Sequence, residues 1–328
     1  MYIIPAYTYT YAMNIYKLLS LFFIFNLTVV YQSKAQEGQE HPVADSVVQS
    51  AKNSLENNGK VQHLYRMNYW ASGGFSLAAT AANVYAIPTI IKSKQQITDA
   101  ELAALNKNVF SGFDRIALEQ NPNDRDDWYK ASDYTLPAIV ASAAVLGLDK
   151  KIQKDWARLL LLYYETHAVT FTLYNFSFFG PAFQNKIRPV SYYNELPVYK
   201  RNGGNNRNSM YSGHTASSAA ATFFMVKVYS DYHPELGAKK YLLYGLASIP
   251  PLAEGYLRVK ALAHFPSDVM MGFVIGAACG IAVPSIHRIR NHNIDIGMTG
   301  TPVGPGVGFT WHPAYKQPVV SGIVKLRP

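Results

Sequence analysis

The stretch Arg258-Val-Lys-Ala-Leu-Ala-His264-Phe-Pro-Ser-Asp268 places an arginine, a histidine and a carboxylate at the start of an apolar run that extends to Ile289. Proline is favoured in the first turn of a helix, so Pro266 predicts that a helix begins directly after His264. The four-residue spacing then brings Asp268 near the ring of His264, or near the backbone that holds it. These residues favour chemistry on an anion at a helix start.

Two upstream segments, Arg188-Pro189 and Ser212-Gly213-His214, supply the other groups that such chemistry needs. An arginine fork matches phosphate oxygens, a neutral histidine can attack phosphorus, and a second histidine can protonate the leaving group. Glycine admits a ligand close to the backbone, and free N–H groups at a helix start attract an anion. For the second segment alone, the alternative is a Ser N-cap with an incidental histidine.

In order and spacing these segments resemble a superfamily that contains type 2 phosphatidic acid phosphatases, bacterial acid phosphatases and vanadium haloperoxidases. That family shows three ordered motifs. The first is a Lys followed, after six residues, by Arg-Pro, and the second is Pro-Ser-Gly-His. The third is Ser-Arg, then five residues, a His, three residues and an Asp. Here the third motif keeps its spacing, with Leu257 in place of Ser, and the second has Tyr211 in place of Pro. The first keeps Arg188, but Pro181 stands where the family has Lys. The matching region, residues 134–289, covers about half of the chain.

The resemblance implies a role for each matching residue. His264 would be the nucleophile that forms a phosphohistidine, Asp268 would orient it, and His214 would be the general acid. Lys186, two residues before Arg188, is a further candidate for binding phosphate. No metal and no cofactor is implied. The groups expected to bind the phosphoryl oxygens are Arg188, Arg258, Ser212 and the Gly213 backbone.

The sequence therefore predicts a metal-independent phosphatase of the cell envelope that hydrolyses a phosphomonoester or diphosphate. Apolar helices favour a lipid phosphate as substrate, and a small soluble phosphate ester is the other candidate. Pro181 in the first motif leaves open a protein that binds phosphate or a lipid headgroup without turnover. A vanadate-dependent haloperoxidase is a third alternative, because the same pocket can hold vanadate.

The N-terminus predicts export. Residues 1–35 contain Lys17, an apolar core over 18–31 and a small-residue site before Gln36, and this is the pattern of a secretory signal peptide. We expect Met13 to be the true start. The alternative is an uncleaved anchor, although the core is short for a membrane span. Export predicts a periplasmic site.

After the signal peptide we expect a polar lead-in (36–66), a helical phosphatase domain (67–292) and a C-terminal extension (293–328). The expected fold class is all-α, a bundle of about six core helices with a small C-terminal β-hairpin-like tail. The tail is predicted because alternating residues follow His292 around Gly and Pro turns. The helices are predicted over residues 68–91, 97–108, 134–148, 156–179, 215–232, 239–257 and 266–289, with a charged loop over 121–127.

The composition bears on whether the domain is soluble or membrane-bound and on which partners it binds. Residues 68–91 and 269–286 carry no charge and are candidate membrane spans, but a mean hydropathy of −0.04 leads us to favour a soluble or peripheral bundle over an integral one. The net charge of +9 suits an anionic lipid surface or a phosphorylated substrate. The basic residues are dispersed, so no nucleic-acid partner is expected. The single cysteine, Cys279, excludes a disulfide within the chain.

Overall fold

The computed structural model describes residues 63–289, 294–301 and 304–311, and nine α-helices form the domain within them. Short 3-10 turns connect the helices, and one of them, Ser142–Leu148, extends α5. The helices are α3 (Tyr69–Ser93), α4 (Asp99–Ala104), α5 (Arg125–Ala141), α6 (Trp156–Phe176), α7 (Val198–Arg201), α8 (Gly213–Tyr232), α9 (Lys239–Ala247), α10 (Ile249–Lys260) and α11 (Pro266–His287).

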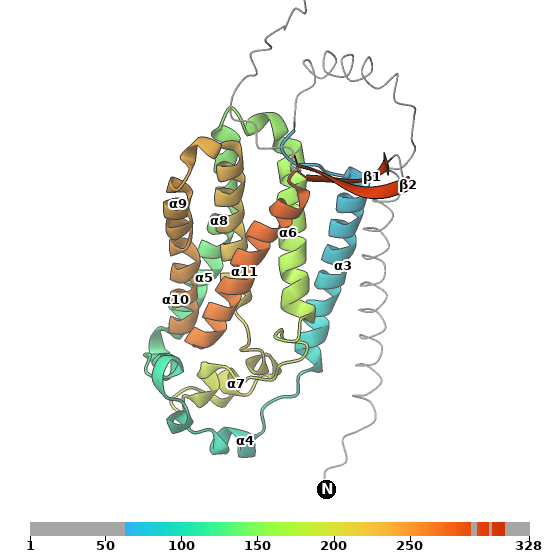
Figure 1. The fold of residues 1–328 in the computed structure, drawn as a ribbon. Helices are drawn as coiled ribbons and strands as arrows, with labels where there is room; N and C mark the ends of the chain where they lie inside the picture. The colour runs from blue at the N-terminus through green and yellow to red at the C-terminus, as the bar shows by residue number, and fades with distance from the viewer. Residues whose placement is uncertain (1–62, 290–293, 302–303, 312–328) are drawn as a thin grey trace, which may run out of the picture.

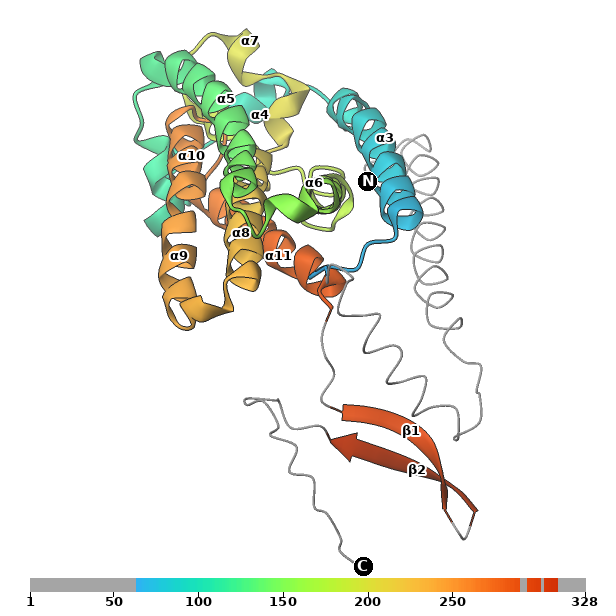
Figure 2. The ribbon, with the colours of Figure 1, turned by 90° about the horizontal axis from the view of Figure 1, so that it is seen from above.

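Helix α8 is the centre of the bundle. It packs against α5, α6, α9, α10 and α11, while α3 lies on the outer side of α6 (Figures 1 and 2). Nearly every position of α8 from Thr215 to Phe224 is buried, which fits its Ala- and Ser-rich sequence. A helix that is buried on all sides cannot show a polar face, and α8 shows none.

Close backbone contact joins α8 to α11. A Cβ atom on Gly276 would lie 2.0 Å from the carbonyl oxygen of Ala216, and one on Gly272 would lie 2.4 Å from that of Ser212. Only glycine permits this approach, as in other close helix pairs. At the lower end of the pair, the Ser212 amide donates to the Asp268 carbonyl at 3.0 Å. The packing therefore holds the starts of α8 and α11, and with them two of the three motifs, side by side.

The predicted helix over 239–257 is divided into α9 and α10 at Ser248. Pro250 and Pro251 follow directly, and Pro251 is buried in the first turn of α10. A proline lacks the N–H that a continuous helix needs and clashes with the preceding turn. The pair of prolines explains why a new helix begins here.

Helix α5 begins earlier than predicted. The segment 121–127, expected to be a charged loop, contains the helix start at Arg125. Asp126 and Asp127 stabilise that start because acidic side chains favour the positive end of a helix. The extra turns bring residues 129–133 into the domain.

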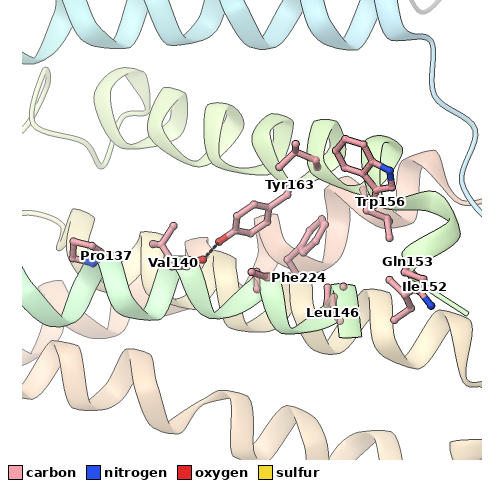
Figure 3. Close-up of a pocket in the computed structure, with 14 residues that line it drawn as sticks. Pro137, Val140, Leu146, Ile152, Gln153, Trp156, Tyr163 and Phe224 are labelled. Atoms are coloured by element: carbon pink, nitrogen blue, oxygen red, sulfur yellow. Dashed lines mark hydrogen bonds between the residues drawn. The ribbon is translucent and has the colours of Figure 1, made fainter. Parts of the chain in front are cut away.

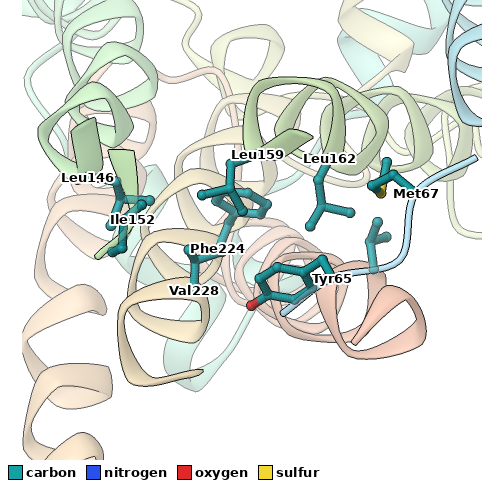
Figure 4. Packing of buried hydrophobic residues seen from close by; sticks show 9 residues of the cluster. Tyr65, Met67, Leu146, Ile152, Leu159, Leu162, Phe224 and Val228 are labelled. Atoms are coloured by element: carbon teal, nitrogen blue, oxygen red, sulfur yellow. The ribbon is translucent and has the colours of Figure 1, made fainter. Parts of the chain in front are cut away.

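A hydrophobic cluster closes the end of the bundle away from the motif segments. It is built around Phe224 and Val228 of α8, and Tyr65 reaches it from the segment before α3. Figure 4 shows these side chains between the helices. The other members are Met67, Leu146, Ile152, Leu159, Leu162 and Val283.

Three described segments are long and apolar enough to cross a membrane: Tyr69–Ser93, Pro122–Leu148 and Pro266–His287. Two of them cover the predicted spans, and the third includes α5. Large apolar side chains on these helices face outward, with exposures of 92% for Trp70 and 75% for Tyr85. Such surface is costly in water. These observations support membrane association, whereas the mean hydropathy had led us to favour a soluble or peripheral bundle over an integral one.

The predicted fold class needs a correction. The all-α class fits, but nine α-helices lie within the described residues instead of about six, and the predicted β-hairpin-like tail is not part of the helical bundle. Strands β1 (Ile294–Thr301) and β2 (Gly304–Trp311) form a two-stranded ladder of their own, and such a ladder is marginal without a core to pack on. The predicted signal peptide, most of the lead-in and residues 312–328 lie outside the described residues.

Candidate functional site

His264 lies in the turn between α10 and α11, where it is 2% exposed. Its Nδ1 is 2.6 Å from the carbonyl oxygen of Ser209. A carbonyl can only accept, so this contact places the proton on Nδ1 and leaves the lone pair of a neutral ring on Nε2. Burial, and then the charges of Arg188 and Arg258, hold the pKa of His264 well below its usual range. The ring is therefore neutral at neutral pH, as a nucleophile requires.

Asp268 contacts the backbone that holds His264, one of the two arrangements that the four-residue spacing allowed, and is linked to the ring through Ser209. One carboxylate oxygen accepts from the Ser209 hydroxyl at 2.6 Å and from the Phe265 amide at 2.9 Å. The other accepts from Lys186 at 2.8 Å. Ser209 thus bonds to Asp268 with its hydroxyl and to His264 with its carbonyl.

Lys186 is committed to an ion pair. Besides Asp268, its ammonium contacts the Ser267 hydroxyl at 3.0 Å and Asp114 at 3.5 Å. Asp114 also accepts from the Ser267 amide at 2.9 Å, so it fixes the first turn of α11. In this geometry the Lys186 ammonium balances the charge of a fully buried carboxylate, and it does not lie among the candidate phosphate ligands.

His214 is in the first turn of α8, and its Nε2 lies 3.1 Å from Asp133 of α5. Burial and the charge of Arg258 lower the pKa of His214 to about 4, while Asp133 acts in the opposite direction. A general acid must carry its proton when the leaving group departs. Asp133 is the group that favours the protonated form.

Two buried arginines, Arg188 and Arg258, lie near both histidines. Arg258 is 1% exposed, donates to Ser132 at 2.8 Å and lies 3.6 Å from Asp133. Arg188 is 8% exposed and donates through Nε to the Asn208 carbonyl at 3.2 Å. Burial, and then the charge of Arg258, lower the pKa of Arg188. Two guanidinium groups that repel each other in a buried site suit a multiply charged anion.

Ser212 and Gly213 lie at the start of α8, as predicted. Ser212 is the N-cap, because its Oγ accepts from the Thr215 amide at 3.3 Å and the Thr215 hydroxyl at 2.9 Å. The hydroxyl hydrogen of Ser212 remains available to a phosphoryl oxygen. A Cβ on Gly213 would lie 3.1 Å from the ring of Tyr174, so the packing there favours glycine.

The site includes residues that our sequence interpretation missed. Tyr129, Ser132 and Asp133 contact the arginines and His214 from α5, and Ser209 links Asp268 to His264. Positions 129, 132 and 133 share one helix face, and that spacing of polar residues was the available signal. It went unused because we expected the helix to begin at residue 134.

An apolar cavity of about 550 Å³ lies between the second half of α5 with its 3-10 extension, the first half of α6, and α8 (Figure 3). Pro137, one helical turn beyond Asp133, is at one end, and Trp156 and Ile152 are at the other. Tyr163 points across the cavity and donates to the Val140 carbonyl at 2.7 Å. Its lining is almost entirely apolar, which suits a hydrocarbon chain.

Comparison with known proteins agrees with the motif pattern. Residues 158–292 match the family model of the PAP2 superfamily, which confirms the predicted resemblance. No curated protein matches the chain. A crystal structure described as the first transmembrane PAP2 type phosphatidylglycerolphosphate phosphatase from Bacillus subtilis is 18% identical, with 66% of this chain and 96% of that chain covered and a TM-score of 0.36.

Within the described residues, no group of three or more His, Cys, Asp or Glu side chains is placed to hold a metal ion. Arg188 and Arg258 lie near the two histidines, beside the Asp133 carboxylate that contacts His214, and arginines bind phosphate oxygens directly.

Proposed function

Because residues 158–292 are a PAP2 superfamily region, we propose that this chain is a metal-independent phosphatase of the cell envelope that acts through a phosphohistidine. The family match supports a phosphatase of the PAP2 type. The finer assignment depends on one observation: the Ser209 carbonyl fixes the His264 proton on Nδ1, so that Nε2 is free to attack.

The proposed reaction gives each of these side chains a step. Nε2 of His264 attacks phosphorus, a phosphorus–nitrogen bond forms, and the bond to the leaving oxygen breaks. His214 gives its proton to that oxygen. Arg188 and Arg258 stabilise the charge on the transferring group, which is the main catalytic requirement of phosphoryl transfer.

The second half of the reaction restores the enzyme. His214, now neutral, takes a proton from water, and the resulting hydroxide attacks the phosphohistidine. The phosphorus–nitrogen bond breaks, and the electron pair of that bond returns to Nε2 of His264. Inorganic phosphate then leaves. Protons and charges balance without an additional reactant.

A lipid phosphate is the proposed substrate. The apolar cavity begins one turn of α5, about 6 Å, beyond the Asp133 that contacts His214. One of the three candidate membrane spans, Pro122–Leu148, includes α5, which lines the cavity, and this supports a substrate that comes from a lipid surface. A phosphate headgroup at the histidines and a hydrocarbon chain in the cavity would use both features. We propose that the predicted signal peptide directs the site to the periplasmic side.

The test is phosphate release by the full mature chain, purified in detergent and assayed with EDTA. The substrates are phosphatidate, a prenyl diphosphate and para-nitrophenyl phosphate, and His264→Ala is the control. EDTA-resistant turnover that the substitution abolishes supports the proposal, and the preferred substrate decides between a lipid and a soluble ester. If wild type and His264→Ala release phosphate equally slowly, the protein is not a phosphatase of this kind.

A further inference from the structure

Tyr129 lies beside Arg258, one of the two arginines of the site. Its ring packs on Arg258, with the guanidinium carbon 4.4 Å from the ring centre. The positive charges of both Arg258 and Arg188 act on its phenol group. Tyr129 comes from α5, which carries none of the three motifs, so neither the motifs nor the family match assigns it a role.

The site has a place for another phosphate ligand. The family's first motif supplies a lysine, and this chain has Pro181 at that position. Lys186, the nearest substitute in sequence, is used to neutralise Asp268. The arginines and Ser212 therefore form a phosphate site with one donor fewer than the motif provides.

The Tyr129 hydroxyl can donate one hydrogen and can accept through its lone pairs. A guanidinium group has donors and no acceptor, so toward either arginine the Tyr129 oxygen could only accept. Its own hydrogen is then not used by either arginine. A phosphoryl oxygen bound between Arg188 and Arg258 would supply the acceptor for that hydrogen.

We propose that the Tyr129 hydroxyl donates to a phosphoryl oxygen and acts, with Arg188 and Arg258, as a third phosphoryl-binding side chain. This inference rests on the proposed function, because it assigns a ligand to the same site. It also gives the site a neutral donor where the family has a charged one. The Tyr129 ring holds Arg258 in place, and the Tyr129 hydroxyl binds the substrate.

The experiment measures binding of orthovanadate and inorganic phosphate to the full mature chain in detergent by calorimetry, which requires no turnover. Tyr129→Phe keeps the ring on Arg258 and removes only the hydroxyl. We expect the dissociation constant for either anion to rise about tenfold, since a hydrogen bond to a charged group is lost. Tyr134→Phe is the matched control, because Tyr134 is on the same helix and 80% exposed, and it should bind as wild type.

A second variant guards against a purely structural effect. Tyr129→His keeps an N–H donor on a ring, and we expect it to retain most of the anion binding at an unchanged melting temperature. Unchanged binding in Tyr129→Phe, or a loss in Tyr129→His as large as that in Tyr129→Phe, overturns the inference. A wild type that binds phosphate without turnover would instead count against the proposed function and leave the role of Tyr129 to be decided by binding.

Discussion

Asp133→Asn removes the carboxylate beside His214 and leaves the shape of the side chain almost unchanged. At 3.1 Å the two charges would attract by about 5 kcal/mol at an effective dielectric constant of about 20. The Asp133 side chain is 50% exposed, so solvent reduces this to about 1 kcal/mol. Since one pKa unit corresponds to about 1.4 kcal/mol, the substitution should lower the pKa of His214 by about 0.7 unit.

The sign of the effect on activity follows from the role of His214. Its pKa is already held near 4, so above that pH only a small fraction of the free enzyme carries the proton. A further fall of about 0.7 unit reduces that fraction about fivefold. The alkaline limb of kcat/KM, which reports the free enzyme, should move to lower pH by the same amount.

The assay compares two substrates over a range of pH. An alkyl phosphate needs a proton on its leaving oxygen, whereas an aryl phosphate has a leaving group that departs more easily. Asp133→Asn should therefore slow the alkyl substrate about fivefold and the aryl substrate much less. Ser132→Ala is the control, because the Ser132 hydroxyl is hydrogen-bonded to Arg258 and not to His214. An alkaline limb that does not move, with equal losses on both substrates, would refute the role of Asp133.

Three further changes test other parts of the structure. Ser209→Ala removes a hydroxyl that donates to the buried Asp268, so kcat should fall about tenfold and the free energy of unfolding by about 1.5 kcal/mol, as measured by steady-state kinetics and thermal unfolding. Lys186→Met leaves a buried carboxylate without its counter-charge, so the free energy of unfolding should fall by about 3 kcal/mol, whereas Lys186→Arg should retain most of the wild-type stability. Equal stability of the wild type and both variants would contradict the ion pair. Gly276→Ala drives a methyl group into the backbone of α8 and should lower the melting temperature sharply, whereas Gly245→Ala, with open space around it, should not.

Much of the site could be predicted because its residues lie at fixed distances from helix starts. Pro266 marks the start of α11, and this places His264 and Asp268 at one end of the bundle. Ser212 marks the start of α8 in the same way. Local spacing sufficed for these positions because a helix converts sequence distance directly into geometry.

The contacts between segments could not be predicted from one sequence. Ser209 is 55 residues from His264 and bonds to it through the backbone, where any residue type offers the same carbonyl. Lys186 is near Arg188 in the chain, yet its charge is drawn to the buried Asp268. Asp133 is 81 residues from His214. Such pairings depend on how helices pack, and spacing along the chain does not contain that information.

The fold was predicted best where composition is uniform. The apolar runs before and after the motifs are the helices α3, α6, α8 and α11, with ends that differ from expectation by a few residues. The start of α5 was placed too late, because a charged segment reads as a loop although acidic residues also stabilise a helix start. Turn residues also predicted a β-hairpin-like tail as part of the fold, but turns alone do not provide a core against which two strands can pack.

The central claim is that His264 is the residue that receives the phosphoryl group. The most direct measurement mixes the enzyme with substrate, quenches the reaction in alkali, in which phosphohistidine survives, and locates the added phosphate by mass spectrometry of the peptides. The account predicts one phosphate on the peptide that contains His264, absent in His264→Ala and present for longer in His214→Ala. Phosphate on another residue, or turnover with no phosphorylated peptide at any quench time, would contradict it.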